Sequence, residues 1–246
     1  MSGRECEWFA EWFDTHYYHL LYRNRDNEEA KLFITRLLGE LTLDENASVL
    51  DLACGKGRHS RTLAEQGFRI VGADLSSNSI EAARLNAPKN AEFIVHDMRE
   101  VIPNQSFDAI FNLFTSFGYF DSMEENAKVV AAIHTMLKPN GFLVIDFMNT
   151  QQIIEGLVAK EVKESSGINF HIERKVEGKH IVKTIAFEDK GRTFQYEERV
   201  QALRIEDFEV LLKKENIQIL RTFGSFEMTS FDEKTSDRLI IIAQKN

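Results

Sequence analysis

The spacing of apolar residues changes twice along the chain. From residue 8 to about residue 41, apolar side chains recur every three or four positions, which predicts amphipathic helices in front of the first strand. From residue 47 to residue 147, short apolar runs alternate with helical spacing. The predicted strands are 47–52, 69–74, 92–96, 107–113 and 141–147, and the predicted helices are 60–66, 76–86 and 124–138. This alternation indicates parallel strands joined by right-handed crossovers.

After residue 147 the period becomes two. Residues 167–200 contain three alternating segments, 171–176, 180–187 and 193–199, separated by Gly178 and by residues 189–192. They predict a small antiparallel sheet. Helical spacing returns over 205–216, and strands are predicted over 217–226 and 239–243. Because the chain has only three prolines and no low-complexity linker, we expect the antiparallel segment to pack on the main domain.

One glycine-rich turn carries the clearest chemical signal. Residues 49–60 read VLDLACGKGRHS, and residues 70–74 read IVGAD, which predicts a strand, a glycine turn, a helix and a second strand that ends in Asp74. Gly55 and Gly57 allow the backbone to approach a ligand, and the helix N-terminus offers N–H groups to an anionic part. Asp74 is placed to accept hydrogen bonds from ribose hydroxyls. The pattern favours a cofactor that contains a nucleoside.

Two positions argue against a dinucleotide. A nicotinamide-binding turn would need a third small residue where Ser60 stands, and Asp51 in front of the turn would repel a pyrophosphate. A carboxylate at Asp51 suits a ligand with an ammonium and a sulfonium group and no phosphate. S-adenosylmethionine has that chemistry.

Residues 51–57, DLACGKG, resemble motif I of class I S-adenosylmethionine-dependent methyltransferases. The family's later motifs follow in order: HDM at 96–98, FDAIFNLF at 107–114, and LKPNGFLVID at 137–146, where Asn140 replaces the first glycine of the usual turn. The resemblance covers about residues 47–245. It implies a Rossmann-like α/β fold with a mostly parallel seven-stranded sheet, helices on both faces, an N-terminal helical cap and a small antiparallel insertion.

The resemblance implies a single domain, residues 1–246, with four parts. These are a helical cap (1–45), a cofactor-binding half (46–149), the antiparallel insertion (165–200) and a C-terminal helix with strands (201–246). It also implies the cofactor contacts: Asp51 near the methionyl ammonium, Arg58 at its carboxylate, Leu75 against the adenine, Asp97 at the adenine amino group, and backbone near Asn112. The complete predicted set is Tyr18, Asp51, Ala53, Gly55, Gly57, Arg58, Asp74, Leu75, Asp97, Met98, Asn112 and Phe114.

Some of these residues would also suit a structural role instead of cofactor binding. Asp51 is also suited to capping a turn, Asp97 to capping a helix over 98–101, and Arg58 to the surface of a first helical turn. Aromatic residues after the fourth predicted strand wall either an acceptor pocket or the core, namely Phe114, Phe117, Tyr119 and Phe120. Side chains of the helical cap could close over the cofactor, namely Tyr17, Tyr18, Tyr22 and Arg25. Cys54, His96 and His134 are read as structural, and no catalytic base is nominated.

Composition narrows the function further. The 246 residues have a formal net charge of −9, which disfavours nucleic acid as the substrate. No apolar run is long enough for a membrane span, and two cysteines, Cys6 and Cys54, are too few for a zinc site or a disulfide framework. No metal site is expected. We therefore expect a cytoplasmic enzyme that methylates a nitrogen, hydroxyl or carboxylate of a small molecule.

Other functions compete with this reading. One is a catalytically silent nucleoside-binding protein of the same fold, and another is a nicotinamide oxidoreductase, which Asp51 and Ser60 disfavour. A basic peptide remains a possible acceptor. The antiparallel insertion is expected to line the acceptor pocket. Its alternating apolar residues would also suit a homodimer contact, namely Ile172, Val176, Ile181 and Ile185.

Overall fold

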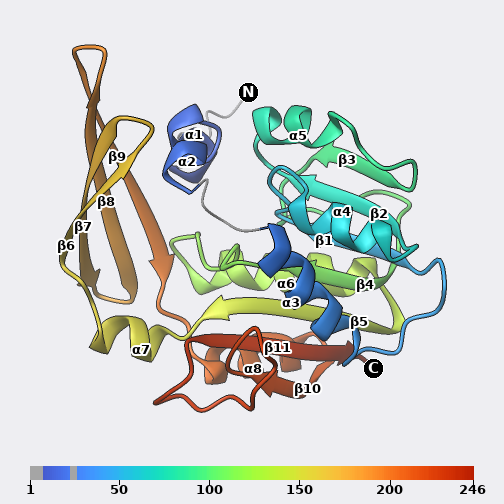
Figure 1. Ribbon diagram of the computed structural model, residues 1–246. Helices are drawn as coiled ribbons and strands as arrows, with labels where there is room; N and C mark the ends of the chain where they lie inside the picture. Colours follow the sequence, from blue (N-terminus) through green and yellow to red (C-terminus); the bar gives the residue numbers. More distant parts are fainter. Residues whose placement is uncertain (1–7, 23–26) are drawn as a thin grey trace, which may run out of the picture.

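The computed structural model describes residues 8–22 and 27–246 (Figure 1). Its main sheet has the strand order β10-β11-β5-β4-β1-β2-β3. β11 is antiparallel to both β5 and β10, and the other neighbours are parallel. The strands are β1 (Ser48–Leu52), β2 (Arg69–Asp74), β3 (Ala91–Val95), β4 (Phe107–Asn112), β5 (Leu137–Met148), β10 (Ile217–Phe223) and β11 (Arg238–Lys245). The predicted seven-stranded α/β fold is confirmed.

Helices cover both faces of this sheet. Successive residues of β1 point to opposite faces of the sheet and so belong to two different cores. Val49 packs with α3 (Asn27–Leu38) and α4 (Arg58–Glu65) on one face. Leu50 packs with α6 (Met123–Met136) and α8 (Ile205–Lys214) on the other. α5 (Ser77–Arg84) lies against β2 and β3. Each of the central strands is therefore buried on both sides, as continuous apolar runs require.

The antiparallel insertion is a separate four-stranded sheet in the order β6-β7-β8-β9. Its strands are β6 (Lys160–Ser165), β7 (Ile168–Glu177), β8 (His180–Asp189) and β9 (Arg192–Gln201). The predicted start at residue 165 is wrong, because β6 precedes it. The sequence KEVKES of β6 is mostly exposed and has no apolar alternation that would predict a strand. The short helix α7 (Thr150–Glu155), between β5 and this sheet, was not predicted either.

The predicted helical cap divides into two parts. α3 packs against α4 in the main domain, whereas α1 (Trp8–Trp12) and α2 (His16–Leu21) contact the antiparallel sheet. Figure 1 shows α1 and α2 between that sheet and the main domain. Trp12 and Leu21 share one apolar cluster with Ile172 and Ile185. Two of the four residues that would have suited a dimer contact, Ile172 and Ile185, are thus covered within one chain, whereas Val176 is 41% exposed. In the described part of the chain, no helix is long and apolar enough to cross a membrane.

Candidate functional site

The glycine turn after β1 is tied to the end of β2 through Asp74. The N–H of Gly55 donates to Asp74 Oδ2 at 2.7 Å, and the N–H of Ser76 donates to Asp74 Oδ1 at 2.9 Å. Ala53, Gly55 and Gly57 have positive φ angles of 62°, 56° and 73°, which give the turn its sharp shape. Burial raises the pKa of Asp74. Asp74 therefore shapes the turn, and it also lines two cavities that adjoin it.

The two glycines of the turn have different surroundings. A Cβ at Gly55 would meet nothing within 4 Å, and Gly55 lines the cleft. A Cβ at Gly57 would lie 2.5 Å from the ring of Phe93, which is buried on β3. The missing side chain of Gly57 thus makes room for Phe93, and Gly57 is not among the residues that line the cleft. Close approach is possible at Gly55.

Asp51 lines the same cleft but is only 1% exposed. It accepts a hydrogen bond of 2.5 Å from the hydroxyl of Ser60. Burial raises the pKa of Asp51 to about 6. Ser60, which argued against a nicotinamide-binding turn, is thus the hydrogen-bond partner of Asp51.

Most of the predicted cofactor residues line two adjoining cavities at the carboxyl ends of β1, β2 and β4. The larger cavity has a volume of about 330 Å³ and includes Tyr18, Asp51, Ala53, Gly55, Arg58, Asp74 and Phe114. The smaller one, of about 50 Å³, includes Leu75, Asp97 and Met98 and shares Ala53 and Asp74 with the first. In open α/β sheets this edge is where ligands bind. We call the two cavities together the cofactor cleft.

Asn112 does not line the cofactor cleft. Its side chain is fully buried, and Nδ2 donates to the carbonyl oxygen of Leu52 at 3.0 Å. Asn112 therefore joins β4 to β1. Its neighbours Leu113 and Phe114 line the cleft instead.

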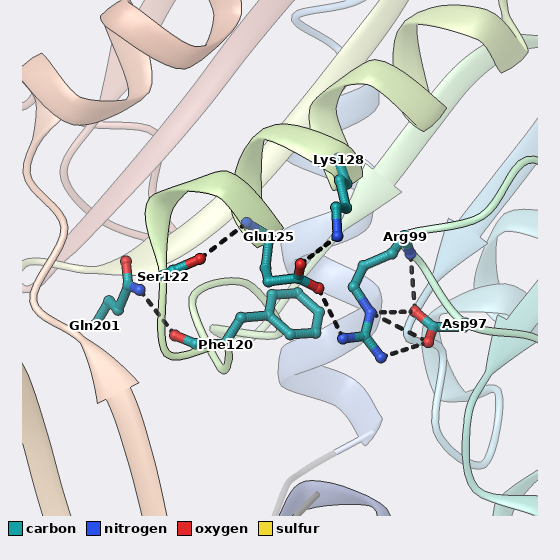
Figure 2. Close-up of polar contacts among 7 residues, drawn as sticks. All are labelled: Asp97, Arg99, Phe120, Ser122, Glu125, Lys128 and Gln201. Atoms are coloured by element: carbon teal, nitrogen blue, oxygen red, sulfur yellow. Dashed lines mark hydrogen bonds and ion pairs between the residues drawn. The ribbon is translucent and has the colours of Figure 1, made fainter. Parts of the chain in front are cut away.

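At the narrow end of the cleft, Asp97 is paired with Arg99 (Figure 2). Arg99 Nη2 lies 2.6 Å from Asp97 Oδ2, and Arg99 Nη1 lies 3.0 Å from Glu125 Oε2. No helix begins after Asp97. Its Oδ1 accepts the N–H of Arg99 at 2.9 Å, so the helix-cap reading of Asp97 is wrong. The guanidinium of Arg99 also lies 4.6 Å from the ring centroid of Phe120, which lines the same cavity.

Arg58 lies over an aromatic wall of the cleft. Its guanidinium carbon is 4.6 Å from the centroid of the Phe114 ring, and His59 stacks on the same ring at 5.0 Å. Delocalised guanidinium groups favour such contacts with aromatic faces. Arg58 is thus held at the cleft rather than projecting into solvent as a surface arginine.

The turn after β4 is strained and is held by a buried ion pair. Phe114 and Thr115 both have φ angles of 58°, an unusual conformation for residues other than glycine. The N–H of Phe114 donates to Asp146 Oδ2, and the N–H of Thr115 donates to the Asp146 carbonyl, both at 2.9 Å. Arg238 Nε donates to Asp146 Oδ1 at 2.8 Å. Asp146 ends the sequence motif at 137–146, whereas Arg238 begins β11, so the motif gave no reason to place the two together.

A third cavity of about 320 Å³ lies beyond this turn, and we call it the acceptor cavity. It shares Tyr18, Tyr22, Phe114 and Tyr119 with the cofactor cleft. The antiparallel sheet supplies Ile181, Lys183, Glu198 and Val200 to its wall. The sequence named Tyr22 among the cap side chains that could close over the cofactor but put only Tyr18 in the predicted set, because helical spacing could not tell which tyrosines face inward.

Several other residues have structural surroundings. Phe117 is in the core, and Tyr17 donates a hydrogen bond of 2.9 Å to Asp189 on the antiparallel sheet. Cys54 packs beside Phe93, as its structural reading predicted. His96 lines the narrow end of the cleft and contacts the carbonyl of Glu100, and His134 lies on α6. Arg25 and Cys6 lie outside the described residues.

Comparison with known proteins places these features in context. Residues 43–192 match the model of a methyltransferase domain. The glycine/sarcosine N-methyltransferase of Aphanothece halophytica is 30% identical over 238 residues, which cover 90% of this chain and 83% of the relative.

Two solved structures share the fold. An S-adenosylmethionine-dependent methyltransferase from Clostridium acetobutylicum has a TM-score of 0.80 and 23% identity, over 94% of this chain and 97% of the other. The S-adenosylmethionine-bound amino pentose methyltransferase CalS10 from Micromonospora echinaspora has a TM-score of 0.70 and 21% identity, over 91% and 93%.

Proposed function

This chain belongs to the S-adenosylmethionine-dependent methyltransferases that act on small molecules, and from this premise we propose how its cavities divide the reaction. The cofactor cleft holds S-adenosylmethionine. Asp51 and Arg58 lie at the methionyl end, Asp74 binds the ribose hydroxyls, and Leu75, Asp97 and Met98 border the adenine. The resemblance inferred from the sequence motifs is confirmed, whereas these individual contacts are proposals.

The acceptor is a nitrogen atom of a small molecule bound in the acceptor cavity. The observation that supports binding of the acceptor in this cavity is the junction of the two cavities at the strained turn, where Phe114 and Tyr119 belong to both linings. A methyl donor in the cleft and a nucleophile in the acceptor cavity can meet there. Relatives named as glycine/sarcosine and aminosugar N-methyltransferases support nitrogen as the nucleophilic atom that accepts the methyl group.

Methyl transfer from a sulfonium is an in-line displacement, so the protein contributes mainly by positioning the two reactants and excluding water. S-adenosylmethionine supplies the activated methyl group. Phe13, Tyr18 and Tyr119 form an aromatic lining common to the two cavities, which suits water exclusion. A base is required only when the nitrogen arrives protonated.

The test is a turnover screen. The protein is incubated with S-adenosylmethionine and matched sets of amines, phenols and carboxylic acids, and the release of S-adenosylhomocysteine is measured. We expect turnover with a subset of the amines. Turnover confined to phenols or acids would contradict nitrogen as the acceptor. Cofactor binding with no turnover on any set would favour the catalytically silent alternative.

A further inference from the structure

One row of charged side chains crosses the inner face of the antiparallel sheet. The strand register places Arg174 on β7 opposite Lys183 on β8, and Lys183 opposite Glu198 on β9. The rows on either side are mainly apolar: Ile172, Ile185 and Tyr196 on one side, Val176, Ile181 and Val200 on the other. Charged residues seldom occupy an inward-facing row, and such a break in the local pattern is typical of a functional surface.

This charged row borders the acceptor cavity. The side chains of Lys183 and Glu198 are only 15% and 14% exposed, with 3.4 Å between Nζ and Oε2. Glu198 also accepts hydrogen bonds from Trp12 Nε1 at 2.7 Å and from the Tyr22 hydroxyl at 2.8 Å. The carboxylate of Glu198 is therefore held by neutral donors from α1 and from the C-cap of α2 as well as by the charge of Lys183.

Cations outnumber carboxylates in the lining of the acceptor cavity. Arg174, Lys183 and Arg238 line it together with Glu198 as the lining carboxylate, while Glu161 and Asp146, which pair with the two arginines, lie outside the lining. Each of the three cations thus has a carboxylate partner, namely Glu161 for Arg174, Glu198 for Lys183 and Asp146 for Arg238. The cavity therefore offers cationic hydrogen-bond donors rather than a net positive charge.

Arg174 has donors suited to an anion. Its bonds to the Val158 carbonyl at 3.3 Å and to Glu161 at 2.6 Å use two of the five N–H donors of a guanidinium. A guanidinium can bind a carboxylate or a phosphate through two parallel hydrogen bonds. Lys183, opposite Arg174 in the register, adds a point charge next to it.

Resting on the proposed function, we infer that Arg174 and Lys183 bind an anionic group of the methyl acceptor. The acceptor is then a small molecule that carries a carboxylate or a phosphate as well as the nucleophilic nitrogen. The anionic group lies against the antiparallel sheet, and the nitrogen points toward the turn at Phe114. The insertion would thus select the substrate by charge.

The test uses acetate and inorganic phosphate as probes, each titrated into the complex with S-adenosylhomocysteine and followed by NMR line broadening. We expect one probe to bind saturably, and Arg174→Leu and Lys183→Met each to weaken it at least fivefold. Lys183→Arg keeps the charge and should retain binding. The matched control is Lys175→Met, because Lys175 is next to Arg174 in sequence but on the opposite face of the sheet. Tighter acetate indicates a carboxylate acceptor, and tighter phosphate a phosphate ester.

Equal probe binding by the parent and both charge-removing variants would overturn the inference, as would the absence of saturable binding by the parent. In either case the row is an internal ion-pair network. S-adenosylhomocysteine affinity is measured on the same samples. A parent that binds S-adenosylhomocysteine but not the anionic probes contradicts this inference alone, and not the proposed function. If the parent does not bind S-adenosylhomocysteine, probe titration of the cofactor-free protein decides the inference. If Lys183→Met does not fold, Arg174→Leu decides it, because Arg174 is more exposed.

Discussion

Asp51 links the chemistry of the cleft to pH. Burial raises its pKa to about 6, from the ordinary aspartate value of 3.8. The folded protein therefore holds this proton more tightly than the unfolded chain does. The resulting contribution to stability is fully present below pH 3.8 and is lost as the pH rises through about 6. In the proposed arrangement, however, the ionised form is the one that attracts the methionyl ammonium.

We predict that stability and cofactor affinity respond to pH in opposite directions. Below pH 6, S-adenosylhomocysteine affinity should fall by up to about tenfold per pH unit, because protonation removes the charge of Asp51. Calorimetric titrations between pH 5 and 7.5 measure this. Asp51→Asn should bind more weakly and lose most of the dependence, with Asp74 accounting for the remainder. A parent affinity that stays constant over the window would contradict the assignment of Asp51.

The two glycines should separate stability from binding. Gly57→Ala places a methyl group against the Phe93 ring, so we predict a loss of about 1–3 kcal/mol in the free energy of unfolding. Gly55→Ala is the matched variant, since it shares a positive φ but meets no neighbour. It should lose cofactor affinity more than stability. Urea unfolding and calorimetry check both, and identical losses in the two variants would refute the distinction.

At this scale the sequence predicted the turn, its strand and the carboxylate at Asp74, because glycine spacing and strand ends are local signals. It could not tell a glycine that faces the cleft from one that faces Phe93, since Phe93 comes from another strand. For the same reason it missed the pairing of Asp97 with Arg99 and Glu125. Those contacts depend on the loop after β3 meeting α6.

At the scale of elements, the ends of β4, β5 and β11 meet around Asp146. Its carboxylate is fully buried and holds both the backbone of the turn at Phe114 and the guanidinium of Arg238. The strained turn is stable only while these contacts persist, because two positive φ angles are unfavourable for residues with side chains. Asp146 and Arg238 therefore position the wall between the cofactor cleft and the acceptor cavity.

We predict that Asp146→Asn lowers the free energy of unfolding by about 3 kcal/mol, because it leaves Arg238 without its charged partner. Turnover should fall more than S-adenosylhomocysteine affinity does. Lys138→Met is the control: its ion pair with Asp108 is about one third exposed, and it should change stability by less than about 1 kcal/mol. Chemical unfolding and steady-state rates check the prediction. A loss for Asp146→Asn no larger than the control's would contradict it.

The period of the apolar residues correctly predicted most strands and helices, including the return to helix at α8. It failed at β6, whose polar residues form an edge strand, and at the start of β5, which begins at Leu137 rather than at residue 141. The charged row on the antiparallel sheet could not be predicted from the sequence either. It depends on the pairing register of three strands, and composition does not determine that register.

At the scale of the whole molecule, the antiparallel sheet and the first two helices form one body over the cavities. Trp12 and Leu21 pack into the apolar face of the sheet, and α2 presents Tyr18 and Tyr22 to both cavities. Gln201, at the end of β9, donates to the carbonyl of Phe120 at 2.8 Å and so joins this body to the loop before α6 (Figure 2).

If the antiparallel sheet were a lid that packs on nothing else, removing it would leave cofactor binding intact. Because α1 and α2 share an apolar core with the sheet, we predict that its removal weakens cofactor binding. Replacing residues 160–200 with a Gly/Ser linker should expose Trp12 and release α2, so we expect S-adenosylhomocysteine affinity to fall at least tenfold and turnover to disappear. Circular dichroism controls for the main domain, and calorimetry measures the affinity. Parent-like affinity in the linker variant would show that α1 and α2 do not depend on the sheet.

The most direct test of the account is the affinity of Asp74→Ala for S-adenosylhomocysteine, measured by calorimetry at pH 7.5. The variant loses the proposed ribose contact and the anchor of the glycine turn, so we predict an affinity lower by about 1.5–3 kcal/mol, or roughly tenfold to more than a hundredfold. Asp108→Ala, at the opposite end of the sheet, should match the parent within about twofold. Parent-like affinity in Asp74→Ala, or a parent that binds NAD in preference to S-adenosylhomocysteine, would contradict the assignment of the cofactor cleft.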